Sequence, residues 1–204
     1  MQALLLVVLL CGSVISASAS IDSCLQILRP HLTIGEKDLL DVEERWSEMT
    51  KLKDDDREEF LQFAGFEDST GAIPSAVKAY DIVSCTTSEA TGSIVIKLMY
   101  VKGVEGTKDE NVYLVTMKNG MYSSKFQIAS LQASCEGTFL RASSTNDDGT
   151  ISVGQLFHVF DCETDKFLNT ETQPTLTVRI RPNGSITQGA GAPAPTPTKR
   201  SDDE

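Results

Sequence analysis

Apolar and polar residues alternate with a period of two between Pro74 and Arg181, which predicts a succession of β-strands. Val, Ile, Thr, Tyr and Phe dominate this region, as is typical of strands. Asn119-Gly120 is a type I′ hairpin signal. The expected strands are residues 77–85, 93–102, 111–117, 122–131, 137–144, 151–161 and 175–181. Short strands joined by short turns predict an antiparallel meander that closes into a barrel or splits into a sandwich.

Residues 21–70 have a helical or mixed pattern. Thr33 and Glu36 have the spacing of a capping box. A second helix is expected to begin near Asp55 or Asp56 and to end at Gly65. The apolar residues behind the capping box fall on one helical face: Leu39, Val42, Trp46 and Met49.

Both ends of the chain differ from the domain between them. Residues 3–10 are an apolar run too short to span a bilayer, and Ala17-Ser18-Ala19 is a cleavage site, so residues 1–19 are expected to be a signal peptide of a secreted protein. No later segment predicts a membrane span. One domain is expected over residues 20–182. Residues 183–204 are predicted to be a disordered tail, and Asn183 begins an N-glycosylation sequon.

The cysteines predict disulfide bonds and not a metal site. Removal of the signal peptide takes away Cys11 and leaves an even number of cysteines in an oxidising compartment, so two disulfides are expected. Spacing alone does not choose among the three pairings. With no Cys-x-x-Cys and only two histidines, a zinc site is not expected.

The charge and the motifs exclude several classes of function. A formal net charge of −11 argues against nucleic acid or an anionic membrane as a partner, whereas a cationic surface or a calcium mineral is compatible with it. No Gly-x-Ser-x-Gly, His-Glu-x-x-His or phosphate-binding glycine loop occurs, and His158 lies in an alternating strand without a nucleophile near it. The sequence therefore predicts no enzyme and no cofactor.

Residues 144–155 have the spacing of an EF-hand loop, with Ser144, Asn146 and Asp148 as candidate ligands. A serine in place of the first Asp and Gln155 in place of the bidentate Glu weaken that interpretation. The same residues place Asn-Asp-Asp-Gly between two half-apolar runs, which is a hairpin signal. A turn is therefore favoured over a calcium site.

The segment 93–101 is apolar on both faces, with Ile94, Ile96, Leu98 and Tyr100 on one side and Val95, Met99 and Val101 on the other. Two interpretations follow. One face lines the interior of a barrel while the other meets a second layer, or both faces fill the core of a sandwich.

Two passages resemble the secreted lipocalins, and in particular the branch of orosomucoid, apolipoprotein M and the toxin-binding orosomucoid-like proteins of fish. The first consists of Cys24, then Leu32-Thr33 and residues 38–46, which end at Trp46, with Glu44 in place of the glycine of the family's Gly-x-Trp. The second is Ser134-Cys135-Glu136-Gly137, followed by an apolar strand, a turn and residues 156–160. The resemblance implies a β-barrel whose open mouth admits a small hydrophobic molecule. It also implies that Cys85 pairs with Cys135 and Cys24 with Cys162.

The resulting hypothesis is a secreted carrier of a small hydrophobic or amphipathic ligand, with Tyr100 or Tyr113 setting its orientation. The alternative is an acidic protein of an extracellular matrix, mucus or biomineral without a small-molecule site. Which strand faces point inward stays open, because a shift of one residue exchanges them. The candidate ligand-binding residues are Ile96, Leu98, Tyr100, Tyr113, Val115, Met117, Phe126 and Ile128.

Overall fold

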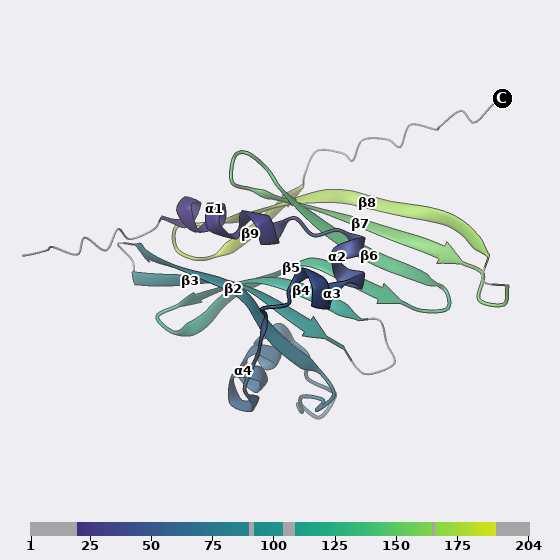
Figure 1. Cartoon of the computed structure of the whole chain (residues 1–204), viewed down its shortest axis with the longest axis horizontal. Helices are drawn as coiled ribbons and strands as arrows, with labels where there is room; N and C mark the ends of the chain where they lie inside the picture. The colour runs from purple at the N-terminus through teal and green to yellow at the C-terminus, as the bar shows by residue number, and fades with distance from the viewer. Residues whose placement is uncertain (1–19, 90–91, 104–108, 165, 191–204) are drawn as a thin grey trace, which may run out of the picture.

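The fold is a nine-stranded antiparallel sheet in which each strand pairs with its neighbours in the sequence (Figure 1). The computed structural model describes residues 20–89, 92–103, 109–164 and 166–190, so the expected signal peptide lies outside the described part. The predicted antiparallel meander is confirmed. The strands are β1 (Thr50–Lys51), β2 (Lys78–Glu89), β3 (Gly92–Lys102), β4 (Glu110–Lys118), β5 (Met121–Ala133), β6 (Gly137–Thr145), β7 (Ile151–Phe160), β8 (Phe167–Ile180) and β9 (Ile186–Ala190).

Three elements of the sheet differ from the prediction. β8 begins at Phe167, eight residues before the expected start at Thr175. β1 was not expected, and β9 lies inside the segment predicted to be disordered, so that prediction is wrong for residues 183–190. Gly184 has a φ of 85° and allows the tight turn that leads into β9.

The sheet curls strongly but stays open, and the predicted closure into a barrel is not seen. Within the described ranges β1 pairs with β2 alone and β9 with β8 alone. Instead, hydrogen bonds that involve side chains connect the β8–β9 region to β4 and β5. The Thr116 hydroxyl on β4 donates to the carbonyl of Gly184 at 2.5 Å, and the Ile186 N–H donates to the Ser124 hydroxyl of β5 at 3.0 Å. The β8–β9 turn therefore folds back over β4 and β5.

The described helices are α1 (Ile21–Leu32), α2 (Glu36–Leu40), α3 (Val42–Arg45) and α4 (Asp54–Ala64). α4 agrees with the second predicted helix and ends at Gly65, whose φ of 85° suits the left-handed C-cap. The predicted capping box is displaced, because Gly35 is the N-cap of α2 and donates its N–H to the Asp38 carboxylate at 2.8 Å. The apolar face beyond it is buried as predicted, at Leu39, Val42 and Trp46, but it is divided between two short helices.

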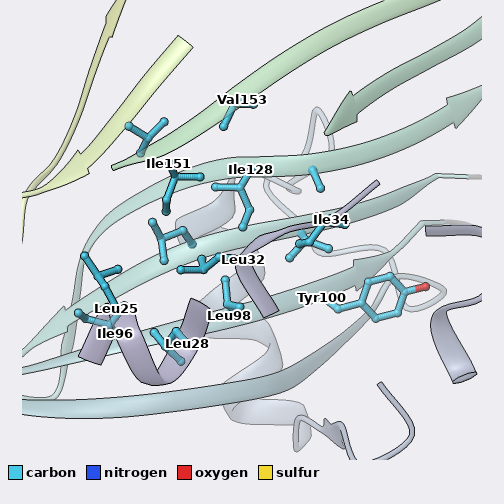
Figure 2. Close-up of a cluster of buried hydrophobic side chains, with 14 of the residues drawn as sticks. Leu25, Leu28, Leu32, Ile34, Ile96, Leu98, Tyr100, Ile128, Ile151 and Val153 are labelled. Carbon is cyan, nitrogen blue, oxygen red and sulfur yellow. The ribbon is translucent and has the colours of Figure 1, made fainter. Parts of the chain in front are cut away.

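Helix α1 fills the concave side of the sheet. Figure 2 shows Leu25, Leu28 and Leu32 of this helix among the side chains of Ile96, Leu98 and Ile128. Leu28, Ile96 and Leu98 have no exposed surface. In the described part of the chain, side chains therefore fill the interior of the curved sheet beneath α1.

Helix α4 covers the opposite, convex face of the same strands (Figure 1). Phe60 and Leu61 of α4 pack with Met99, Val101 and Val115. Strand β3 is apolar on both faces because it lies between α1 and α4, and each face belongs to a separate core.

The structure replaces the predicted disulfide pairing. Cys24 of α1 is bonded to Cys85 of β2, so the pairs Cys24–Cys162 and Cys85–Cys135 are wrong. α1 packs along β2, which brings these two sulfurs together. The exposed sulfurs of Cys135 and Cys162 lie 2.6 Å apart, in turns held together by the bond from the Phe160 N–H to the Glu136 carbonyl at 2.9 Å.

Candidate functional site: the Tyr100 pocket

A cleft of about 380 Å³ opens where the ends of β2, β3 and β4 meet α2 and α3. Its volume is in the range of small-molecule sites. We call it the Tyr100 pocket, after the predicted site residue that lines it. Its walls are Leu39, Leu40, Asp41, Val42, Glu43, Glu44, Met49, Tyr80, Tyr100, Lys102 and Glu110.

One wall of the pocket is aromatic. Tyr80 and Tyr100 are directly opposite each other on β2 and β3, and their ring centroids are 5.5 Å apart. The ring of Trp46 lies 6.1 Å from that of Tyr100 and is almost fully buried. Trp46 and Tyr100 are almost fully buried and Tyr80 is half-buried, so the wall presents a small aromatic surface together with tyrosine hydroxyl groups that can fix orientation.

Glu110 places a carboxyl group beside this wall. It is the first residue of β4, and the Tyr100 hydroxyl donates a hydrogen bond to its carboxylate. Burial disfavours the charged form and raises the pKa of Glu110 to about 7. At neutral pH both forms of the carboxyl group are therefore populated, and it can accept or donate a hydrogen bond.

The rim of the pocket is mostly acidic. Among the described residues, Asp41, Glu43 and Glu44 are exposed there, against one exposed cation, Lys102. Leu40, with 56% of its surface exposed, adds an apolar edge. The arrangement suits a ligand with an apolar body and a polar end that donates hydrogen bonds or carries positive charge.

The structure does not bring the eight predicted ligand-binding residues to one cavity. Ile96, Leu98 and Ile128 are buried in the core beneath α1, and Phe126 packs against that core. Val115 and Tyr113 face α4 on the convex side. Met117 is half-buried and belongs to neither core. Tyr100 alone among the eight lines the pocket at α2 and α3.

Sequence reasoning missed the polar half of the pocket. Tyr80 falls inside a predicted strand but carries no signal of its own. Lys102 is the last residue of β3 and Glu110 is the first residue of β4, and the two are directly opposite each other. The sequence did contain a signal for these two residues. A charged residue stands at each end of the connection between two apolar strands, and such residues come together when the strands pair.

The segment with EF-hand spacing forms the turn between β6 and β7, as predicted. It borders a polar hollow of about 270 Å³ beside α1. One carboxylate oxygen of Asp148 is already engaged, because it accepts hydrogen bonds from the Thr150 N–H at 3.0 Å and hydroxyl at 2.6 Å. In the part of the chain that the structure describes, no three His, Cys, Asp or Glu side chains gather as a metal site.

The sequon lies in the exposed β8–β9 turn. The Asn183 side-chain oxygen accepts hydrogen bonds from the N–H of Ser185 at 3.0 Å and from its hydroxyl at 2.8 Å. Asn183 is exposed, so glycosylation at this turn stays a prediction that the fold accommodates.

Comparison with known proteins finds no matching family model, no matching curated protein and no matching solved structure. Of the helices in the described ranges, none combines the length and the apolar character needed to cross a membrane.

Proposed function

We propose that the protein is a secreted, lipocalin-like binding protein that carries a small amphipathic ligand in the Tyr100 pocket. The observation that carries this proposal is the meeting of an aromatic wall, Tyr80 and Tyr100, with the half-buried carboxyl group of Glu110. A site that recognises a small molecule combines apolar walls with a few polar groups that fix its orientation.

In this mode of binding, the apolar body of the ligand lies against Met49, Leu40 and Tyr80, and its polar end meets Glu110 and the Tyr100 hydroxyl. Burying about 200 Å² of ligand surface contributes roughly 5 kcal/mol at 25 cal/mol per Å². The lost freedom of the ligand offsets part of this gain. The acidic rim favours a neutral donor or a cation over an anion.

Two features support the secreted and lipocalin-like parts of the proposal. A disulfide between Cys24 and Cys85 is compatible with an oxidising, extracellular compartment. Trp46, the residue that follows α3, is buried beside Tyr100 of the meander.

The test uses the only tryptophan in the chain, Trp46, as a reporter. Purified protein is titrated with a long-chain alcohol, a long-chain alkylammonium and a fatty acid, and Trp46 fluorescence is followed. We expect a saturable change with the alcohol or the ammonium. Native mass spectrometry of the same samples should show one bound molecule.

Matched variants locate the site. Tyr100→Phe removes one hydroxyl and is expected to weaken binding by roughly twofold to tenfold, as for one neutral hydrogen bond. Glu110→Gln should weaken binding of the ammonium probe. Tyr113→Phe is the control, because Tyr113 faces α4 on the convex side. Absence of any adduct and any fluorescence change would reject the carrier function, and sensitivity to Tyr113→Phe alone would move the site to the convex face.

A further inference from the structure

Strand β8 has an open edge along its first half. Leu176 to Ile180 pair with β9, whereas Phe167 to Gln173 pair with β7 alone among the described residues. Every residue from Phe167 to Pro174 is exposed. An edge of this kind offers its backbone N–H and C=O groups to a further strand.

The hydrogen bonds of the β6–β7 hairpin identify which groups β8 offers. Asn146 donates its N–H to the carbonyl of Thr150 at 2.8 Å, so the even-numbered residues of β7 bond to β6 and the odd-numbered ones to β8. The odd-numbered residues 155, 157 and 159 are opposite Gln173, Glu171 and Asn169 of β8. Thr170 and Thr172 alternate with these residues and therefore turn their N–H and C=O groups towards the open edge.

We propose that this edge pairs with the same edge of a second copy of the chain, as two antiparallel strands related by a two-fold axis at Thr170. The N–H and C=O groups of Thr170 then face those of Thr170 in the second copy and form two hydrogen bonds. Thr172 is opposite Leu168 of the second copy, and the two-fold axis makes this contact occur twice. One sheet then runs through both copies.

Charge and proline select this register over its neighbours. An axis at Glu171 would place the two Glu171 carboxylates directly opposite each other, which is unfavourable. An axis at Thr172 would place Pro174, which has no N–H to donate, opposite Thr170. The axis at Thr170 instead places Asn169 opposite Glu171 on both sides, where the amide of Asn169 can donate to the carboxylate.

The free part of the edge is centred on Thr170. At one end, the carbonyl of Lys166 already accepts the N–H of Asp161 at 2.9 Å. At the other end, Ala190 closes the ladder of β9 opposite Leu176. Two copies paired about Thr170 therefore overlap between Lys166 and Pro174, where β9 of neither copy stands in the way.

The side chains of the edge do not oppose such pairing. Residues 167–173 contain neither lysine nor proline, the residues that commonly protect an edge, and Glu171 is their one charge. Phe167 and Leu168 are 51% and 54% exposed. The register places Phe167 opposite Gln173 and Leu168 opposite Thr172, so the second copy covers part of both apolar side chains.

The C-terminal residues of the same chain are a poorer occupant. Arg181 donates its N–H to the carbonyl of Ser185 at 2.8 Å, so the odd-numbered residues of β9 bond to β8. A strand continued in this register would turn residues 193, 195 and 197 towards β8, and all three are prolines without an N–H. The dimer is independent of the Tyr100 pocket.

The test follows the mass of the purified full chain by light scattering between about 1 and 100 µM, the range suited to a small interface. We expect a dimer that dissociates on dilution. Amide hydrogen exchange should show protection of Thr170 and Thr172 that increases with protein concentration. Thr170→Pro removes two donors at the axis without removing a bond to β7, and should raise the dissociation constant at least tenfold. Thr170→Val is the matched control, because it keeps the N–H and the branched side chain.

A pair of charge variants tests the register. Asn169→Asp places a carboxylate opposite Glu171 on both sides and should weaken dimerisation by roughly threefold or more. Gln188→Glu makes the same change of charge on the exposed face of β9 and should leave dimerisation unchanged. Protection of amides in β3 and β4 shows that each variant is folded.

Three results would overturn the proposal. The first is a natural chain that stays monomeric at 100 µM. The second is a dimer that Thr170→Pro and Thr170→Val affect equally, because the interface would then lie elsewhere. The third is protection of Thr170 and Thr172 that does not depend on concentration and is lost in a chain ending at Ala190, because the C-terminal residues would then occupy the edge.

Discussion

The Cys24 sulfur on α1 is bonded to the Cys85 sulfur on β2, across a sequence separation of 61 residues. The bond anchors the helix that fills the concave side of the sheet. Replacing both cysteines by alanine is expected to lower the free energy of unfolding by about 4 kcal/mol, the chain-entropy value for a loop of this length. Urea unfolding followed by circular dichroism measures the change. A loss below about 1 kcal/mol would show that α1 holds its place without the bond.

Cys135 and Cys162 are predicted to form the second disulfide of the secreted protein. Their sulfurs lie 2.6 Å apart, and both side chains are exposed to an oxidant. Peptide mapping of the non-reduced protein should recover one linked pair with Cys24 and Cys85 and another with Cys135 and Cys162. Recovery of Cys24 linked to Cys162 would contradict the fold described above.

Leu28→Ala tests whether the concave side is a packed core. Leu28 has no exposed surface, so its truncation is expected to cost 2–5 kcal/mol of stability, as is typical of buried leucines. Ile27→Ala is the control on the same helix, because 58% of Ile27 is exposed and its truncation should change stability by less than about 0.5 kcal/mol. If both variants lose the same small free energy of unfolding in urea, α1 does not pack inside the sheet.

Glu110→Gln is expected to change how stability depends on pH. Burial raises the pKa of Glu110 from 4.5 to about 7, so between these values the folded state binds more protons than the unfolded state. This contribution is fully present below pH 4.5 and is lost as pH rises through 7. After allowance for solvent screening, the natural protein should lose on the order of 1–2 kcal/mol relative to the variant over this range. Parallel stability curves at pH 4.5 and pH 8 would show that Glu110 has an ordinary pKa.

The strands and α4 could be predicted from the sequence because their signals are local. Period-two alternation identifies β2 to β7 and the second half of β8, and Gly65 ends α4 where expected. The first half of β8 was not predicted, because its residues are exposed on both faces and therefore show no alternation of apolar and polar residues. β9 was not predicted, because it consists mainly of polar residues and glycine. Its strand conformation depends on its pairing with β8.

The candidate site could be predicted only in part. Tyr100 was identified because it lies on an apolar face of a strand. The filled interior depends on where α1 packs, and neither alternation nor helical spacing fixes that position. Glu110 lies one residue before its predicted strand, and only the meeting of β2, β3 and β4 with α2 and α3 brings it to Tyr80 and Tyr100.

The most direct test of the proposed site is a crystal structure of the protein with a brominated long-chain alcohol, in which anomalous scattering locates the bromine. The account predicts the alcohol oxygen within hydrogen-bonding distance of Glu110 and the Tyr100 hydroxyl, with α1 still in the concave core. A bromine found at the position that Leu25, Leu28 and Leu32 occupy in the concave core, or beneath α4, would contradict it.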